Sequence, residues 1–318
     1  MPKLPRHLPL PDRSVLFLLT AVSAVIVAAC GGAPSRSPSV GVPSGGPSGG
    51  PIPSTVPSPT TTGEIEHRTG STDVILRLQE AGGFVPIEVN ASAAPIFTLY
   101  GNGVIVFQRP IQVFPEPDAA GIVRPAPWRT AKLDESQIQE LLEFALGAGG
   151  LGAARESYHA DGIADAPDTI FTVRAGGVDK TVTVNALFEL PQPGPDAAIR
   201  RAMLQLSSRL RDVDRGGSIP SDVYVAERYR AILVEREAQP GLVVTPWPWP
   251  ALTLKDFTQP PDDGSGALRI PHRVLSTDEI AALKVPNVEG GFQGLTLKAP
   301  DGRIYSFILR PLLVDEPE

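Results

Sequence analysis

Cysteine and histidine are both scarce in this chain. Among its 318 residues there is one cysteine, Cys30, and there are four histidines. Residues 64–318 therefore contain no cysteine, which excludes a disulfide framework and a thiol nucleophile from that region. Neither His-x-x-x-His nor Cys-x-x-Cys spacing occurs, so the sequence offers no ligand set for a transition-metal site. Residues 64–318 also lack the Gly-x-Ser-x-Gly and Ser-x-x-Lys signatures of serine hydrolases.

Positive charge is limited as well. Residues 64–318 carry 34 acidic and 24 basic side chains, which leaves a net charge of −10. The basic residues are scattered and form no run. Nucleic acid and anionic lipid surfaces both require a positive footprint, so neither is an expected partner of this region.

The first thirty residues have the organisation of an export signal. Val15–Ala29 is an apolar run of fifteen residues, preceded by basic residues. About 20 helical residues are needed to cross a bilayer comfortably, whereas an h-region of a signal peptide is shorter. The run ends in Val27, Ala28, Ala29 and Cys30.

This ending resembles the lipobox of bacterial lipoprotein signal peptides: an aliphatic residue, two small residues and a cysteine. The resemblance covers residues 1–32. It implies cleavage after Ala29, diacylglycerol on the Cys30 thiol, and acylation of the new amino terminus by a fatty acid such as palmitate. It places the protein on the outer face of the cytoplasmic membrane, in the periplasm or at the cell surface. The alternative is an uncleaved anchor with an incidental cysteine.

Residues 30–63 are predicted to be a tether that begins with the lipidated cysteine. They consist mostly of Gly, Pro, Ser, Thr and Val, and Arg36 is the single charged residue. Such a composition cannot bury a core, so we expect a disordered linker between the signal peptide, 1–29, and the folded region.

The sequence of residues 64–318 predicts an α+β fold of antiparallel hairpins with helices packed on one face. Three hairpins are expected, around the turns at 101–103, 175–177 and 300–302. Three helices are expected to start near Asp134, Asp196 and Ser276. A capped helix followed by a hairpin occurs twice, which suggests two related α+β units at 64–215 and 216–318. Residues 310–316 are expected to leave the last strand as an edge or a tail.

Two local clusters are candidate ligand sites. Asp161, Asp165 and Asp168 could gather around Ca²⁺, which prefers oxygen ligands, although Asp in Asp-Gly and Pro-Asp pairs is also an ordinary turn former. Trp247 and Trp249 lie in a Pro-Trp-Pro-Trp-Pro segment. Exposed, they could stack on a sugar or dock a peptide; buried, they would simply pack in the core.

These observations support three functional hypotheses and assign no catalytic residue. The first is a non-enzymatic, membrane-anchored lipoprotein that binds a protein, a glycan or a small solute. The second is a cell-envelope hydrolase that uses a pair of Asp or Glu side chains from distant parts of the sequence. The third is an inhibitor or chaperone that presents the Pro/Trp-rich loop at 240–250.

Overall fold

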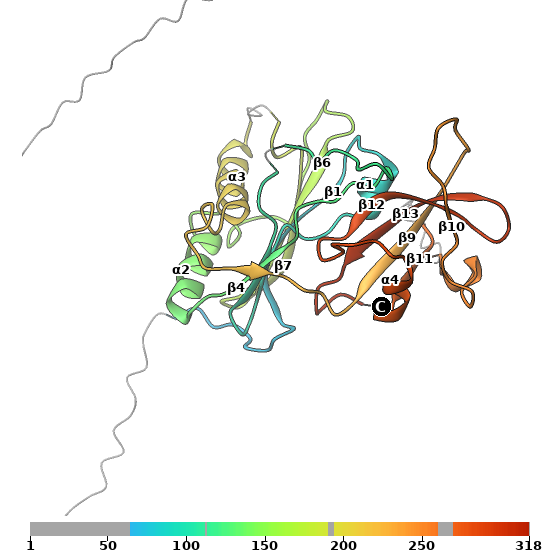
Figure 1. Cartoon of the computed structure of the whole chain (residues 1–318). Coiled ribbons are helices and arrows are strands. Elements are labelled where there is room, and N and C mark those ends of the chain that lie inside the picture. Colours follow the sequence, from blue (N-terminus) through green and yellow to red (C-terminus); the bar gives the residue numbers. More distant parts are fainter. Residues whose placement is uncertain (1–63, 112, 190–193, 260–269, 318) are drawn as a thin grey trace, which may run out of the picture. The chain divides into compact units, whose positions relative to one another are not determined.

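The computed structural model describes residues 64–317 except 112, 190–193 and 260–269. The expected signal peptide and tether, with Val27, Ala28, Ala29 and Cys30, lie outside the described residues. Residues 59–318 form one compact unit. It contains two sheets together with helices, which confirms the α+β fold class (Figure 1).

The helices and strands follow one another along the whole described region. The helices are α1 (Ile87–Ala91), α2 (Glu135–Leu146), α3 (Ala197–Arg211) and α4 (Thr277–Ala282), with a 3-10 turn at Leu254–Asp256. The strands are β1 (Val74–Gly82), β2 (Phe97–Tyr100), β3 (Val104–Phe107), β4 (Arg129–Lys132), β5 (Ser157–Tyr158), β6 (Pro167–Ala175), β7 (Val178–Asn185), β8 (Asp222–Val223), β9 (Tyr229–Arg236), β10 (Thr245–Pro246), β11 (His272–Leu275), β12 (Phe292–Lys298) and β13 (Ile304–Pro311).

The first sheet has eight strands in the order β5-β7-β6-β1-β2-β3-β4-β8. It contains two of the predicted hairpins, β2–β3 and β6–β7, both antiparallel. In the β2–β3 turn, Gly103 has a φ of 85°, a left-handed conformation that favours glycine. Helices α2 and α3 lie side by side along one face of this sheet, as predicted (Figure 1). Their apolar faces pack on strand residues such as Leu78 and Phe97.

All three helices start where predicted, and the capping pairs expected at Asp134 and Ser276 are both present. Asp134 accepts a hydrogen bond from the backbone N–H of Gln137 at the start of α2, and Gln137 returns one to Asp134. Ser276 and Glu279 form the same reciprocal pair at α4. The side chain of Asp196 makes no capping bond at α3, which ends at Arg211 rather than at the glycines that follow.

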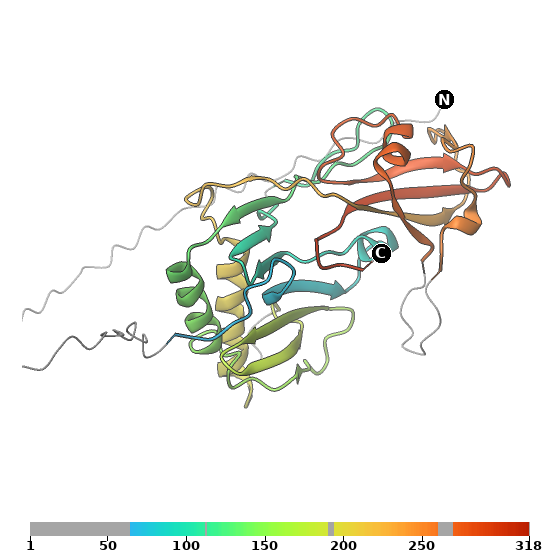
Figure 2. The ribbon, with the colours of Figure 1, turned by 90° about the horizontal axis from the view of Figure 1, so that it is seen from below.

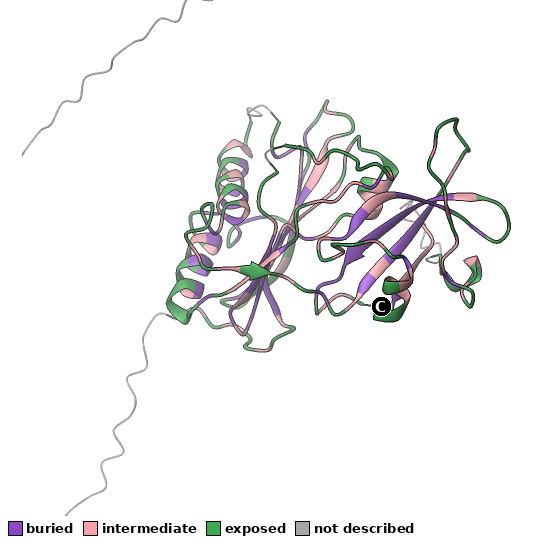
Figure 3. Cartoon of the chain, in the orientation of Figure 1, coloured by how far each residue is buried: buried purple, intermediate pink, exposed green. Residues whose placement is uncertain are grey.

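The second sheet has five strands in the order β10-β12-β13-β9-β11. The third predicted hairpin, β12–β13, belongs to it. The expectation that the last strand would be an edge or a tail was wrong. β13 is the central strand because it pairs with both β12 and β9, and Leu312 and Leu313 beyond it are buried. Buried residues run along the central strands of both sheets (Figure 3).

The C-terminal residues connect the two sheets. Leu313 packs in a cluster with Val74, Tyr100 and Trp128 of the first-sheet region. On the second sheet, Ile232, Val234 and Ile308 form a cluster to which Ala91 of α1 adds. Figure 2 shows the chain beyond β13 running between the two sheets. Nε of Arg310 in β13 donates to the carbonyl of Ala93, two residues beyond α1, at 3.1 Å. The sheets change between β8 and β9, and the division into two related units stays a prediction.

Candidate functional site

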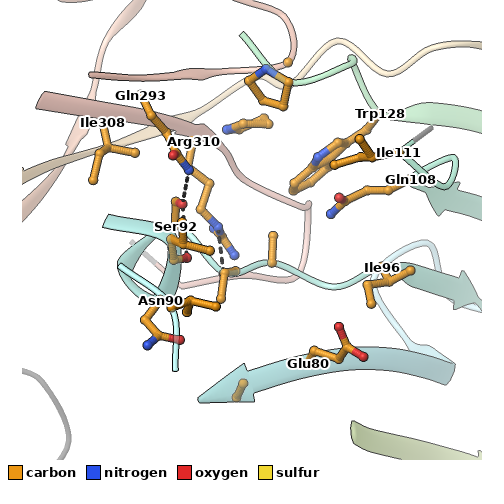
Figure 4. A pocket seen from close by; sticks show the side chains of 18 of the residues that line it. Glu80, Asn90, Ser92, Ile96, Gln108, Ile111, Trp128, Gln293, Ile308 and Arg310 are labelled. Carbon is orange, nitrogen blue, oxygen red and sulfur yellow. Dashed lines mark hydrogen bonds between the residues drawn. The ribbon is translucent and has the colours of Figure 1, made fainter. Parts of the chain in front are cut away.

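A cleft of about 640 Å³ lies between the two sheets. Strand β1 and residues at the starts of β2 and β4 supply one wall, while β12 and β13 supply another. Helix α1, the residues that follow it and the segment after β3 also line the cleft, together with single residues such as Pro167 of β6 and Arg211 of α3. Figure 4 shows Gln293 and Ile308 on one side of the cleft and Ile96 and Trp128 on the other.

The walls of the cleft are mainly apolar. Ile96 and Trp128 come from the first sheet and its flanks, and Phe292 and Ile308 come from the second. Trp128 is buried, and its ring stacks on Tyr224 with the ring centroids 5.9 Å apart. A concave surface of this size and lining is typical of sites that bind small molecules or short segments of a partner.

Exposed apolar side chains occur in two segments that contribute to the lining. Val85 and Val89 line the cleft, and next to them in the chain Phe84 is 91% exposed. Ile111 also lines it, and Phe114, three residues further on, is 83% exposed. Exposed apolar residues that occur singly need no explanation, but a group beside an apolar cleft marks an interaction surface.

Three arginines line the cleft, and each is paired with a carboxylate. Arg109 donates two hydrogen bonds to Asp214, at 2.8 and 2.6 Å, and Asp214 is only 2% exposed. Arg310 donates to Glu316 at 3.2 Å through Nη1. Arg211 donates to Glu80. The charges therefore cancel locally.

Three side-chain amides also line the cleft. Gln293 donates through Nε2 to Oγ of Ser92 at 2.7 Å, and Gln108 donates through Nε2 to the carbonyl of Pro95 at 3.1 Å. Both bonds leave the amide oxygen available. Within the described part of the chain, the side chain of Asn90 has no hydrogen-bond partner. The cleft thus presents uncharged donors and acceptors among apolar walls.

Two tyrosines behind the cleft are held in their neutral form. Burial raises the pKa of Tyr100, and the hydrogen bond that its hydroxyl donates to Asp315 at 2.6 Å raises it further. Burial also raises the pKa of Tyr224 to about 12, with Glu316 and Glu227 adding to the effect. Neither phenol is therefore available as a base near neutral pH.

The site does not contain the carboxylate pair that a hydrolase would need. Among the described residues that line the cleft, Glu80 is the one carboxylate, and it is bonded to Arg211. General acid–base cleavage of a glycosidic bond uses two facing carboxyl groups. The geometry of this cleft therefore gives the hydrolase hypothesis no support.

The aspartate cluster does not form a metal site in the structure. Oδ1 of Asp168 accepts a hydrogen bond from Asn185 at 3.0 Å, while Asp161 and Asp165 are exposed in the loop before β6. Across the described ranges, no group of three His, Cys, Asp or Glu side chains is placed to hold a metal ion. The turn interpretation accounts for Asp161 and Asp165, whereas Asp168 lies in strand β6 and pairs with Asn185 of β7.

The two tryptophans pack in the apolar cluster of the second sheet. Trp249 is 4% exposed, and its indole N–H donates to the carbonyl of Glu279 at 2.7 Å. Half-buried Trp247 donates to the carbonyl of Leu252 at 2.8 Å and meets Trp249 edge-on, with the rings 5.1 Å apart. Both indoles are therefore part of the core, and they do not form an exposed ligand platform.

Sequence reasoning missed the residues that form the cleft. The sequence analysis expected no element at α1. A signal was nevertheless present in two apolar pairs, Phe84-Val85 and Val113-Phe114, each followed by proline. Proline disfavours a central strand position, so such pairs indicate apolar loops on the surface.

No family model, curated protein or solved structure matches this chain. Within the residues that the structure places, no helix combines the length and the apolar character that a membrane crossing requires.

Proposed function

We propose that this protein is a lipid-anchored extracytoplasmic binding protein, and that the cleft between its two sheets binds an apolar ligand. The observation that carries the binding role is the cleft itself: apolar walls from both sheets, with exposed apolar residues beside it. Burial of these side chains by a ligand would remove apolar surface from water, which is favourable by about 25 cal/mol per Å².

The anchoring part of the proposal is supported by the N-terminal sequence. A basic start, a fifteen-residue apolar run and the sequence Val-Ala-Ala-Cys occur together, and the cysteine is the only one in the chain. Two or more acyl chains on Cys30 would give stable attachment to a bilayer. A binding protein of this design captures its ligand close to the membrane.

The other two hypotheses receive less support. The cleft contains no pair of facing carboxylates among its described residues, which disfavours the hydrolase. The inhibitor or chaperone hypothesis requires an exposed Pro/Trp-rich loop. Both indoles of that loop instead pack against other residues of the protein. The apolar cleft is the feature that remains unexplained without a ligand.

The binding role can be tested with an uncharged apolar fluorophore, N-phenyl-1-naphthylamine. We expect its fluorescence to rise on binding to the intact protein. Ile111→Glu and Val85→Glu place a charge on exposed residues of the cleft, so they should weaken binding at least tenfold without unfolding the protein.

Val243→Glu is the matched control, because Val243 is also exposed but does not line the cleft. It should bind the probe as the unmodified protein does. No binding by the unmodified protein, or the same affinity in all three variants, would refute the proposed site.

A further inference from the structure

We infer that the ligand of this cleft is an uncharged, apolar segment of extended polypeptide. This inference rests on the proposed function, because it assigns a chemical class to the occupant of the same site. Three features of the lining carry it: free amide groups, cancelled charges, and apolar walls on two sides.

The amide groups fit the backbone of a bound peptide. Asn90 has no partner among the described residues, and Gln108 and Gln293 each keep a free amide oxygen. A peptide backbone carries one N–H donor and one C=O acceptor at each non-proline residue. Side-chain amides offer both kinds of group, so they can bond to a backbone in either direction.

The arrangement of charges selects an uncharged segment. Arg109, Arg211 and Arg310 are already paired with Asp214, Glu80 and Glu316. An anionic ligand would have to displace a carboxylate, while a cationic one would find no unpaired carboxylate in the described lining. A charged residue buried here would therefore lose its hydration without gaining a partner.

The two apolar walls fit an extended chain. Figure 4 shows Ile96 and Ile111 on one side of the cleft and Asn90 of α1 on the other. Ile111 and the α1 residue Val89 are 56% and 43% exposed. Successive side chains of an extended segment point in opposite directions. A single apolar strand could thus contact both walls while its backbone faces the amides.

A free acyl chain would contact the apolar walls but could not form hydrogen bonds with the side-chain amides. It would cover Asn90, Gln108 and Gln293 without providing any hydrogen-bond partner. Covering polar groups in this way costs free energy, whereas a peptide backbone replaces the lost water bonds. The polar content of the lining therefore favours a polypeptide over a lipid chain.

The test uses a fluorescein-labelled peptide with neutral ends, Val-Ala-Val-Ala-Val-Ala, and fluorescence polarisation with the intact protein. A second peptide has the same side chains but carries methyl groups on alternate backbone nitrogens, which removes donors and preserves apolar contacts. We expect the first peptide to bind at least tenfold more tightly than the second. Excess unlabelled first peptide should displace N-phenyl-1-naphthylamine, and methyl palmitate, an uncharged acyl chain, should not.

Variants then identify the groups that recognise the backbone. Asn90→Ala and Gln108→Leu should each weaken peptide binding about three- to tenfold, since each removes one or two hydrogen bonds. Both should weaken binding of the peptide more than binding of N-phenyl-1-naphthylamine, which has no peptide backbone to bond with these amides. Gln205→Leu is the matched control, because Gln205 is exposed on α3 and away from the cleft.

The outcomes separate the inference from the function on which it rests. Equal affinity for the two peptides, or displacement of the fluorophore by methyl palmitate but not by peptide, would overturn the polypeptide assignment and leave an apolar binding site. Failure of the fluorophore itself to bind would overturn the proposed function.

Discussion

The carboxylate of Asp315 accepts two hydrogen bonds from one nitrogen of the Arg77 guanidinium, at 2.7 and 2.8 Å. These residues lie 238 positions apart, one in β1 of the first sheet and the other beyond β13 of the second. Asp315 also accepts from Tyr100. The C-terminal segment therefore binds to the first sheet through charge-assisted hydrogen bonds, which are stronger than hydrogen bonds between neutral groups.

Asp315→Ala should destabilise the protein. Both partners of the pair are only 15% exposed, so the change leaves a largely buried guanidinium without its carboxylate. We expect a loss of about 2–4 kcal/mol in the free energy of unfolding, measured by urea denaturation. Asp179→Ala removes an exposed partner of Arg174 and should cost less than about 1 kcal/mol. If Asp315→Ala lowers the free energy of unfolding no more than Asp179→Ala does, the Arg77–Asp315 pair contributes little to stability.

The raised tyrosine pKa values predict a loss of stability in alkali. Tyr224 has a folded pKa of about 12 against 10.0 for an ordinary tyrosine, and that of Tyr100 is also raised. A raised folded pKa means that the unfolded state releases its proton first as the pH increases. The contribution of these tyrosines to the free energy of unfolding is therefore fully present below pH 10. It declines as the pH rises from 10 through the pKa values of the folded state.

Two measurements check this alkaline dependence. Absorbance of tyrosinate at 295 nm should show that a part of the five tyrosines ionises only when the protein unfolds. Urea denaturation should give a free energy of unfolding that falls more steeply above pH 10 than in Tyr224→Phe. Tyrosines that all titrate near pH 10 in the folded protein would contradict the prediction.

The stability of helix α2 should depend on its N-cap residue, Asp134. Asp134 caps the helix through the backbone N–H of Gln137 at 2.9 Å, so Asp134→Ala should cost about 1 kcal/mol. Asp196 occupies the equivalent place before α3 without a capping bond and pairs instead with exposed Arg155. Asp196→Ala should therefore cost less, about 0–1 kcal/mol. Thermal unfolding followed by circular dichroism would compare the two, and a larger effect at Asp196 would reverse the interpretation.

Local signals predicted the hairpins and the capped helices because each depends on neighbouring residues. The turn at Gly101–Gly103 and the Asp134–Gln137 pair can be recognised within a few positions. Strand β9 was not predicted, although its apolar run Ala231–Val234 is typical of a strand buried on both faces. The central place of β13 depends on its pairing with this unrecognised strand.

The cleft could not be predicted in the same way, because its walls come from opposite ends of the folded region. Ile96 and Ile308 face one site only because β13 and the C-terminal segment return to the first sheet. No periodicity or spacing encodes such a long-range contact. The candidates chosen from sequence, the aspartates and the tryptophans, were instead local clusters, which turn formation and core packing explain.

Cys30→Ser tests the predicted anchor. The resemblance to lipoprotein signals implies that lipid is attached to the thiol, and a hydroxyl cannot replace that sulfur in the modification. We expect the variant to move from the membrane fraction to the soluble or precursor fraction, and mass spectrometry should show no acyl chains on it. Ser35→Ala, five residues away, changes the tether without touching the lipobox and should remain in the membrane fraction. Purified native protein that retains Met1, or that carries an unmodified sulfur at position 30, would exclude this anchor and leave the cleft to be explained as part of a protein without a lipid attachment at that residue.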